Sequence, residues 1–390
     1  DGSSERRNFI ANSASRADGV ALGGSFVWDA GYVGASVDTY RNDYGIVAED
    51  DITIRMRRDR IALAGELRPR GGFFSALRAQ GAGTDYRHQE IEGDGSVGTT
   101  FANDGSDARL EAVHRALALG GGQLEGSFGL QYESSDFSAL GEEAFVPSTH
   151  TRQQSVFVLE RWSWGEGGSV SSGLRAEQVR VRSGGDADPE EPQFGPPQER
   201  RFSPFSAALG AVMKLDERWQ LSANASYTER APTSYELYAN GVHAATGTFE
   251  RGDTQQALEK GRNLDLGLAW RRGANEVKLG LFAARFSNYI LLAATGEPDF
   301  VDAEGDAFPV YAFSGVRAEL YGLEAEAVWR LLDGPRSLDI DARFDMVRGT
   351  DTSKQEPLPR LAPQRATLGL TLGQGGWTAR AEVQYAGDQT

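Results

Sequence analysis

Strict alternation of apolar and polar residues recurs along most of this chain and limits what it can fold into. Clear stretches are 123–132, 219–228, 321–331 and 338–346. In 219–228 the odd-numbered positions are Trp, Leu, Ala, Ala and Tyr, and the even-numbered positions are Gln, Ser, Asn, Ser and Thr. A period of two places successive side chains on opposite faces of a β-strand. The pattern predicts an all-β chain of about 16 strands, several longer than the 9–11 residues that cross a bilayer.

The segments between these strands alternate in length. Short turns rich in glycine and charge are predicted near 28–31, 69–72, 119–122, 165–168, 215–218, 271–275, 332–336 and 373–376. Long polar segments lie near 43–51, 86–97, 138–150, 183–199, 229–262, 291–309 and 348–359. Short turns at one end and long loops at the other are typical of a transmembrane antiparallel β-barrel, with the turns periplasmic and the loops extracellular. A soluble sandwich or propeller has no reason to sort its loops in this way.

Composition narrows the function classes. The chain has 390 residues, no cysteine and a formal net charge of −16. Thiolate metal sites are therefore excluded, and nucleic acid is disfavoured as a partner because phosphate binding needs clustered Lys and Arg. A mean hydropathy of −0.44 would suit a soluble protein. A barrel also gives a low average, because only alternate residues face lipid.

No catalytic constellation stands out. The chain has four histidines and lacks a Gly-x-Ser-x-Gly elbow, and no Gly-Lys-Ser/Thr follows the glycine turn at 120–122. The carboxylate pairs Asp339/Asp341 and Glu324/Glu326 share a strand face, as glycosidase carboxylates could. We interpret them as part of a polar lumen wall. We predict neither catalytic residues nor a tightly bound cofactor.

The alternation also predicts which residues face lipid. One set should point outward: Leu221, Ala223, Leu266, Leu268, Leu323, Ala325, Ile340 and Phe344. A second set should face the lumen: Asn224, Asp265, Glu324 and Asp341. Aromatic residues beside the short turns should form an interfacial girdle: Trp28, Tyr32, Trp219, Trp270, Trp329 and Trp377.

Five sequence blocks, taken in order, resemble TonB-dependent outer-membrane receptors, and among these most resemble the zinc-uptake type. The most specific is ERAPTSYELYANGVHAATGTFERGD…LEKGRNLDLGL, within 229–268. The others are 23–46, 97–105, 136–151 and 320–331. The resemblance implies a barrel of 22 strands preceded by a plug. Residues 1–390 would then be a partial barrel, with the N-terminal plug and the terminal strands not present.

The resemblance also implies a function. The receptor would import a metal ion or metal chelate, zinc or siderophore-like, across the outer membrane of a Gram-negative bacterium. Its partners would be the TonB–ExbB–ExbD complex, reached through the plug, and outer-membrane lipid and lipopolysaccharide. The receptor would be a monomer. A passive porin-like channel and a secreted all-β binding module are the alternatives, and a plug with a TonB box in the full gene separates receptor from porin.

Metal ligands without cysteine must be imidazole and carboxylate. His243 lies in the longest loop, and Glu142, Glu143 and His150 lie in another loop of the same predicted mouth. These four are the candidate metal residues, and zinc captured there as cargo should bind more weakly as the pH falls toward about 6. The alternative is that His243 only stabilises a folded loop.

Two acidic loops offer oxygen ligands at alternate positions, which suits weak calcium binding. They carry Asp186, Asp188, Glu190 and Glu191, and Asp299, Asp302, Glu304 and Asp306. The alternative is a pair of solvated loops whose charge concentrates cations at the mouth.

Overall fold

The computed structural model describes residues 10–47, 51–141, 144–186, 190, 192–243, 246–303 and 305–388. Sixteen strands of ten residues or more alternate with short elements. The long strands are β1 (Ser15–Trp28), β2 (Gly31–Gly45), β3 (Thr53–Leu67), β4 (Phe74–Ile91), β5 (Val97–His114), β7 (Gly122–Gly141), β8 (Thr149–Trp164), β9 (Gly168–Ser183), β11 (Phe205–Lys214), β12 (Trp219–Arg230), β15 (Glu259–Arg272), β16 (Asn275–Ala294), β19 (Val310–Leu332), β20 (Arg336–Asp351), β22 (Arg365–Gln374) and β23 (Trp377–Ala386). The short elements are β6 (Leu117–Leu119), β10 (Gln198–Phe202), α1 (Ser234–Tyr238), β13 (Asn240–His243), β14 (Thr248–Arg251), β17 (Phe300–Val301), β18 (Ala307–Phe308) and β21 (Glu356–Pro357).

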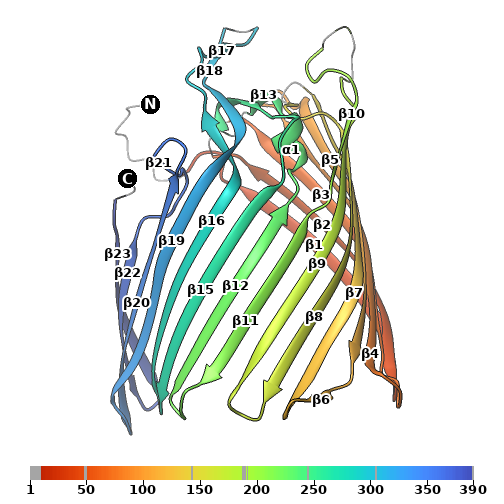
Figure 1. Ribbon diagram of the computed structural model, residues 1–390. Helices are drawn as coiled ribbons and strands as arrows, with labels where there is room; N and C mark the ends of the chain where they lie inside the picture. The colour runs from red at the N-terminus through yellow and green to blue at the C-terminus, as the bar shows by residue number, and fades with distance from the viewer. Residues whose placement is uncertain are drawn as a thin grey trace.

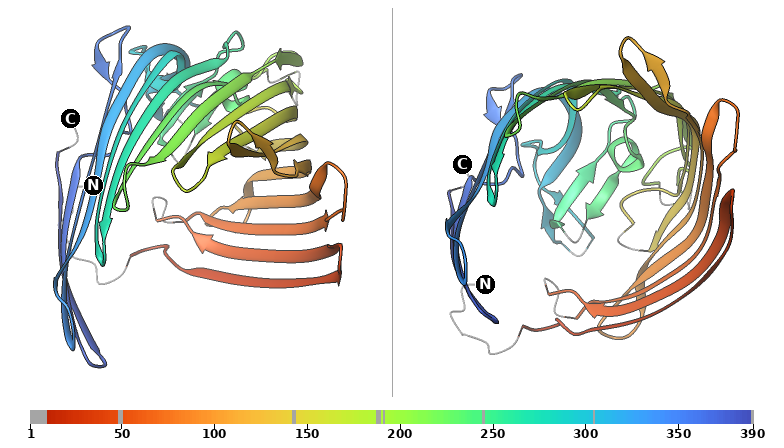
Figure 2. Two further views of the ribbon diagram at one scale, coloured as in Figure 1. Left: turned by 60° about the horizontal axis from the view of Figure 1, so that its bottom comes forward. Right: turned by 90° about the horizontal axis from the view of Figure 1, so that it is seen from below.

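The long strands form one antiparallel meander, in which each pairs with the next long strand along the chain. They tilt and curl into a curved wall around a lumen, with β1 and β23 at its two edges (Figures 1 and 2). Within the described residues no pairing joins β1 to β23. The prediction of an all-β barrel wall with about 16 strands is confirmed.

The connections are sorted by length, as predicted. Tight turns at one end include those at Gly165 and Gly273, whose φ angles of 51° and 60° favour glycine. At the other end the chain forms longer loops that hold β10, α1, β13, β14, β17, β18 and β21 (Figure 1). None of the helical structure in the described residues is long and apolar enough to cross a membrane.

Cross-strand register assigns the two faces of the wall, because directly opposed residues share a face. Leu221 pairs with Leu268, and Ala325 pairs with Phe344, which places the predicted outward residues on one apolar face. Asn224 pairs with Asp265 on the other face and donates a hydrogen bond to it at 3.1 Å. The lumen is on this polar side. The helix α1, which lies inside the barrel, packs against the odd-numbered residues of β9, whereas the even-numbered Leu174 of β9 is 49% exposed on the other face.

The aromatic girdle is present with one correction. Trp219 pairs with Trp270, and the Trp270 ring stacks on Trp329 at 5.4 Å on the outward face near the short turns. Tyr32 instead pairs with Glu66, on the charged face. The prediction for Tyr32 was wrong because proximity to a turn sets the depth of a ring, whereas strand parity sets its face.

The register generates a test with two neighbouring positions. Leu266 is central in the outward apolar run of β15, and Asp265 faces the lumen. We expect Leu266→Arg to reduce folding stability in lipid vesicles by about 2–4 kcal/mol, because arginine would lie in hydrocarbon, while Asp265→Arg costs much less. Urea titration followed by tryptophan fluorescence measures both variants. A larger loss for Asp265→Arg would reverse the assignment of faces.

Candidate functional site

The longest loop, residues 231–258, folds back into the lumen. It carries α1 and the β13–β14 hairpin, which lie inside the ring of strands when the barrel is viewed along its axis (Figure 2). The helix starts at a capping box in which the Thr233 hydroxyl accepts the Glu236 N–H and the Glu236 carboxylate accepts the Thr233 N–H. Reciprocal capping satisfies backbone donors that a helix of this length would otherwise expose.

Arg230 attaches this loop to the barrel at the point where β12 ends. Its guanidinium donates two hydrogen bonds to Glu236 at 2.8 and 3.0 Å, and two to Glu259 at 3.2 and 3.1 Å. Glu236 belongs to α1 and Glu259 begins β15. A single planar cation therefore joins the strand that enters the loop, the helix, and the strand that leaves it.

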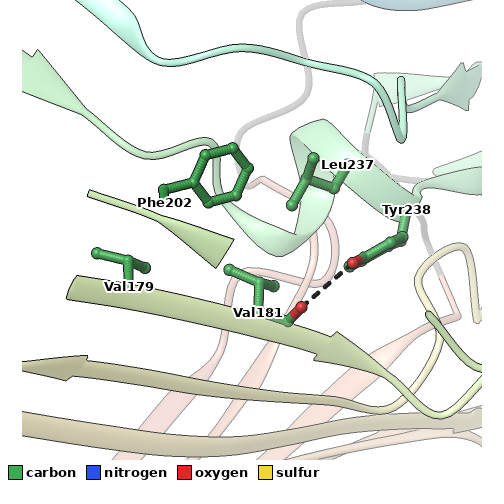
Figure 3. Packing of buried hydrophobic residues seen from close by; sticks show 5 residues of the cluster. All are labelled: Val179, Val181, Phe202, Leu237 and Tyr238. Atoms are coloured by element: carbon green, nitrogen blue, oxygen red, sulfur yellow. Dashed lines mark hydrogen bonds between the residues drawn. The ribbon is translucent and has the colours of Figure 1, made fainter. Parts of the chain in front are cut away.

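A small apolar core fixes α1 against the lumen wall. Leu237 is fully buried and packs with Tyr238 against Val179, Val181 and Phe202 (Figure 3). The Tyr238 hydroxyl donates a hydrogen bond to the Val181 carbonyl at 3.3 Å. Burying a side chain of leucine size contributes about 1.5–3 kcal/mol, so this cluster is a substantial anchor for a five-residue helix.

The hairpin presents His243 beside a buried carboxylate. The Nδ1 atom of His243 lies 2.9 Å from the Glu250 carboxylate, and its ring stacks on Phe145 at 4.3 Å. Burial disfavours the charged form of Glu250, but hydrogen bonds from His243, Thr246 and Thr248 outweigh it and lower the pKa of that carboxyl. An ionised carboxylate only accepts hydrogen bonds, so Nδ1 is the donor and a neutral ring keeps Nε2 as an acceptor.

Two further loops are bonded to the hairpin. The Gln193 side-chain amide donates to the Ala144 carbonyl at 3.0 Å and to the Asn240 carbonyl at 2.8 Å. The backbone N–H of Asn240 donates to the Phe145 carbonyl at 2.8 Å. Inside the mouth, β14 also pairs in parallel with β19. The loops that follow β7, β9 and β12 thus form one connected surface.

This surface and the nearby wall strands line an open cavity of about 610 Å³. Six rings form a continuous arc of contacts along it, with neighbouring centroids 4.3–6.4 Å apart. In order they are His88, Phe101, Phe137, Tyr235, Phe145 and His243. Glu90, Glu250 and Arg360 add charge to the lining. A volume of this size with a few polar groups suits a small-molecule ligand.

His88 is a site residue that sequence reasoning did not single out. It lies on the lumen face of β4, stacks on Phe101 at 4.6 Å, and its Nδ1 is 2.9 Å from the Tyr86 hydroxyl. The signal was Tyr86, His88 and Glu90 at alternate positions, which places all three on one strand face. Nothing in the chain marks them as partners of the distant loop 231–258, because the contact depends on how that loop folds.

The four predicted metal residues are not gathered in one place by the described structure. His243 lines the cavity, while Glu142 and Glu143 lie outside the described residues. His150 pairs with Arg182, and its Nδ1 lies 2.6 Å from Asp136, on the outward face of the wall. Among the described residues no group of three or more His, Asp or Glu side chains is arranged to hold a metal ion.

In the two acidic loops, two aspartates close their own turns. Asp186 accepts the Gln193 N–H at 2.7 Å and also that of Phe194, and Asp302 accepts the Asp306 N–H at 2.7 Å. Asp188, Glu191 and Glu304 lie outside the described residues. These contacts are the ones expected of self-closing loops.

The alternating faces, the sorted loops and the ligand-sized cavity at the mouth define a membrane β-barrel with a binding site among its long loops. The model of the family "TonB dependent receptor-like, beta-barrel" matches residues 2–390. The chain therefore belongs to the TonB-dependent receptor family, whose members are transporters and not enzymes.

Solved structures with the same fold agree. The "Copper transporter OprC" superposes with a TM-score of 0.77 at 15% identity, over 96% of this chain and 61% of that chain. The Serratia marcescens hemophore receptor HasR, in complex with its hemophore HasA and heme, superposes with a TM-score of 0.70 at 13% identity. The match covers 95% of this chain and 64% of that chain. The alcaligin outer-membrane receptor FauA from Bordetella pertussis superposes with a TM-score of 0.65 at 16% identity. The match covers 95% of this chain and 60% of that chain. The chain thus spans about three fifths of their length.

The Arg230 contacts generate a prediction about the loop. Arg230→Gln leaves Glu236 and Glu259 close together without their cation, so we expect faster hydrogen exchange across α1. Because Arg230 is 41% exposed, solvent screening limits the local loss to about 1–2 kcal/mol. Arg251→Gln is the matched control, since Arg251 binds Glu297 with both side chains exposed. Equal exchange in the two variants would contradict the role given to Arg230.

A pH prediction follows from Glu250. Its pKa is lowered by folding, so its charged form stabilises the hairpin above the ordinary carboxyl pKa of about 4.3, and that contribution is lost as the pH falls through the lower folded value. Exchange at β13–β14 amides should therefore differ between wild type and Glu250→Gln at pH 7. The difference should shrink below about pH 4. A difference that persists at lower pH would show that the carboxylate charge is not what holds the hairpin.

Proposed function

We propose that this chain is the barrel of an outer-membrane receptor that takes up a metal chelate bearing flat aromatic or apolar groups. The observation that carries the proposal is the arc of six rings between His88 and His243 around a cavity of about 610 Å³. Aromatic faces bind other π-systems in offset or edge-to-face geometry and gain about 0.5–1.5 kcal/mol per pair. A bare ion would need several ligand atoms within about 2.5 Å instead.

His243 has the environment of an imidazole prepared for a metal. Metal-binding histidines usually donate their second ring N–H to a carboxylate, which orients the ring and raises its basicity. The Nδ1 contact with Glu250 has this form and leaves Nε2 as an acceptor. In the proposed complex His243 would bind an open coordination position of the chelated metal, or accept a hydrogen bond from the chelator.

Energy coupling completes the proposal. This chain covers about three fifths of the length of the matched structures, and in the proposal the complete receptor adds a plug and further strands. TonB, with ExbB and ExbD, would act on that plug to open the lumen in the outer membrane of a Gram-negative bacterium. Family membership favours this over a passive porin-like channel or a secreted binding module. The names of the matched proteins include copper, heme and alcaligin, so the likeness does not select the cargo.

The test measures cargo affinity of the full receptor by tryptophan quenching. We expect a ferric catecholate, whose rings can stack, to bind more tightly than a ferric chelate without aromatic groups. Tyr235→Leu and Phe137→Leu should each weaken binding about three- to tenfold, because each removes ring contacts of the arc. Phe300→Leu is the control, since the Phe300 ring contacts the Phe249 ring in the same mouth but does not line the cavity.

Free zinc provides the competing outcome. If Zn²⁺ binds tightly, if His243→Ala abolishes that binding while the loop stays folded, and if no chelate binds, the cargo is the ion and the chelate proposal is wrong. If His243→Ala leaves both zinc and chelate affinity unchanged at neutral pH, His243 has only a structural role in the loop.

A further inference from the structure

An unusual set of arginines lies on the outward face of the wall, near the loop end of β8 and β9. Arg152 pairs directly with Arg180, and Arg180 pairs directly with Arg201 of β10. In the adjacent row Arg182 pairs with Glu199. We call Arg152, Arg180, Arg182 and Arg201 the arginine cluster. Three like charges opposed across neighbouring strands repel one another, so the arrangement costs stability unless an anion offsets it.

The protein itself supplies little negative charge to offset the arginine cluster. Glu199 lies within ion-pair distance of three cluster members, Arg180, Arg182 and Arg201, at 3.6, 2.8 and 2.6 Å. Hydrogen bonds from Arg182 and then Arg201 hold the pKa of Glu199 at about 2, which reflects the positive surroundings. Arg152 has no ion-pair partner among the described residues. This cluster is cationic although the whole chain carries a net charge of −16.

Directly below the cluster the same face is hollowed and apolar. A shallow cavity of about 580 Å³ is lined by Leu110, Leu130, Tyr132, Val156 and Ala176. Val156 lies two outward positions from Arg152 on β8, and its partner Ala176 lies two outward positions from Arg180 on β9. A row of glutamines lies between them. Those glutamines, Gln154 and Gln178, also line the cavity, so Arg152 and Arg180 lie one outward position, about 7 Å along the strand, beyond its edge.

Another outward arginine row shows what a balanced arrangement looks like. Arg41 pairs with Arg57 and Arg57 pairs with Arg87, but carboxylates occupy the next outward row. There Asp59 binds Arg57 and pairs with Asp85. Among the described residues the ion pairs of the arginine cluster on β8, β9 and β10 are all with Glu199, and the nearby Asp136 is bonded to His150.

We propose that the arginine cluster and the cavity beneath it form a binding site for a phosphate-bearing lipid of the surrounding membrane. The lipid phosphate would lie among Arg152, Arg180 and Arg201, whose planar guanidinium groups match phosphate oxygens. An acyl chain would lie in the cavity against Val156 and Ala176. The site requires that the barrel stand in a membrane with its loops toward the leaflet that carries this lipid, and it is independent of cargo.

Native mass spectrometry of the full receptor in detergent tests the site, with bisphosphorylated lipid A as the probe. We expect the double variant Arg152→Gln/Arg180→Gln to lower affinity for this lipid at least tenfold, because it removes two charge-assisted contacts. Ala176→Trp, which fills the cavity, should weaken the same complex. Arg285→Gln should leave it within twofold, because Arg285 is also outward and exposed but already binds Glu319 at 3.2 Å.

Two comparisons can overturn the proposal. Lipid A without its phosphates must bind weakly, and with equal affinity, to wild type and the double variant. If lipid A with and without phosphates binds equally tightly, the cluster is not a phosphate site. Inorganic phosphate must not compete at millimolar concentration, since effective competition would assign the cluster to free phosphate. All variants must migrate as folded barrels and keep wild-type cargo affinity, which separates this test from that of the cavity in the mouth.

Discussion

Backbone hydrogen bonding is the constraint on which the rest of this structure depends. The hydrocarbon of a bilayer offers no partner for peptide N–H and C=O groups, so strands that cross it must pair with both neighbours. Fourteen of the sixteen long strands meet this demand in chain order along the wall, and β1 and β23 at its edges are each paired on one side within the described residues. Pairing then fixes register, and register decides which side chains meet lipid. A slip of one residue would exchange Leu266 with Asp265.

The position of the binding site is determined by that register. The parity that turns Leu174 outward turns Val179 and Val181 inward, where they receive Leu237 and Tyr238 of α1. The same rule applied to β4 turns Tyr86 and His88 toward the cavity. The inward position of the cavity in the mouth and the outward position of the arginine cluster thus both result from one alternation.

The wall could be predicted from the chain because its signal is local. Alternation and turn composition sufficed for the strands, the sorted loops and the facing of Leu221 or Asp265. Tyr32 was assigned wrongly, although its parity matches Ser36 and Asp38 on the lumen face of β2. The interior of the mouth was not predictable in this way. Its geometry depends on contacts between distant loops, such as Gln193 with Asn240, that no periodicity records.

The mouth also differs from the wall in how its parts are held. Neighbouring wall strands are hydrogen-bonded along most of their length, whereas the β13–β14 hairpin is joined to the rest of the barrel by a few contacts near its base. Those contacts include the Gln193 bridge, the backbone hydrogen bond from Asn240 to Phe145 and the short ladder from β14 to β19.

The parallel ladder between β14 and β19 has a consequence for the shape of the mouth. Three residues of the hairpin, Phe249 to Arg251, are bonded to a strand that runs the full height of the barrel. Movement of this hairpin away from the wall would have to break that ladder. The shape of the cavity that the hairpin lines is therefore coupled to the register of the wall, since the same ladder that belongs to β19 also sets the position of β14.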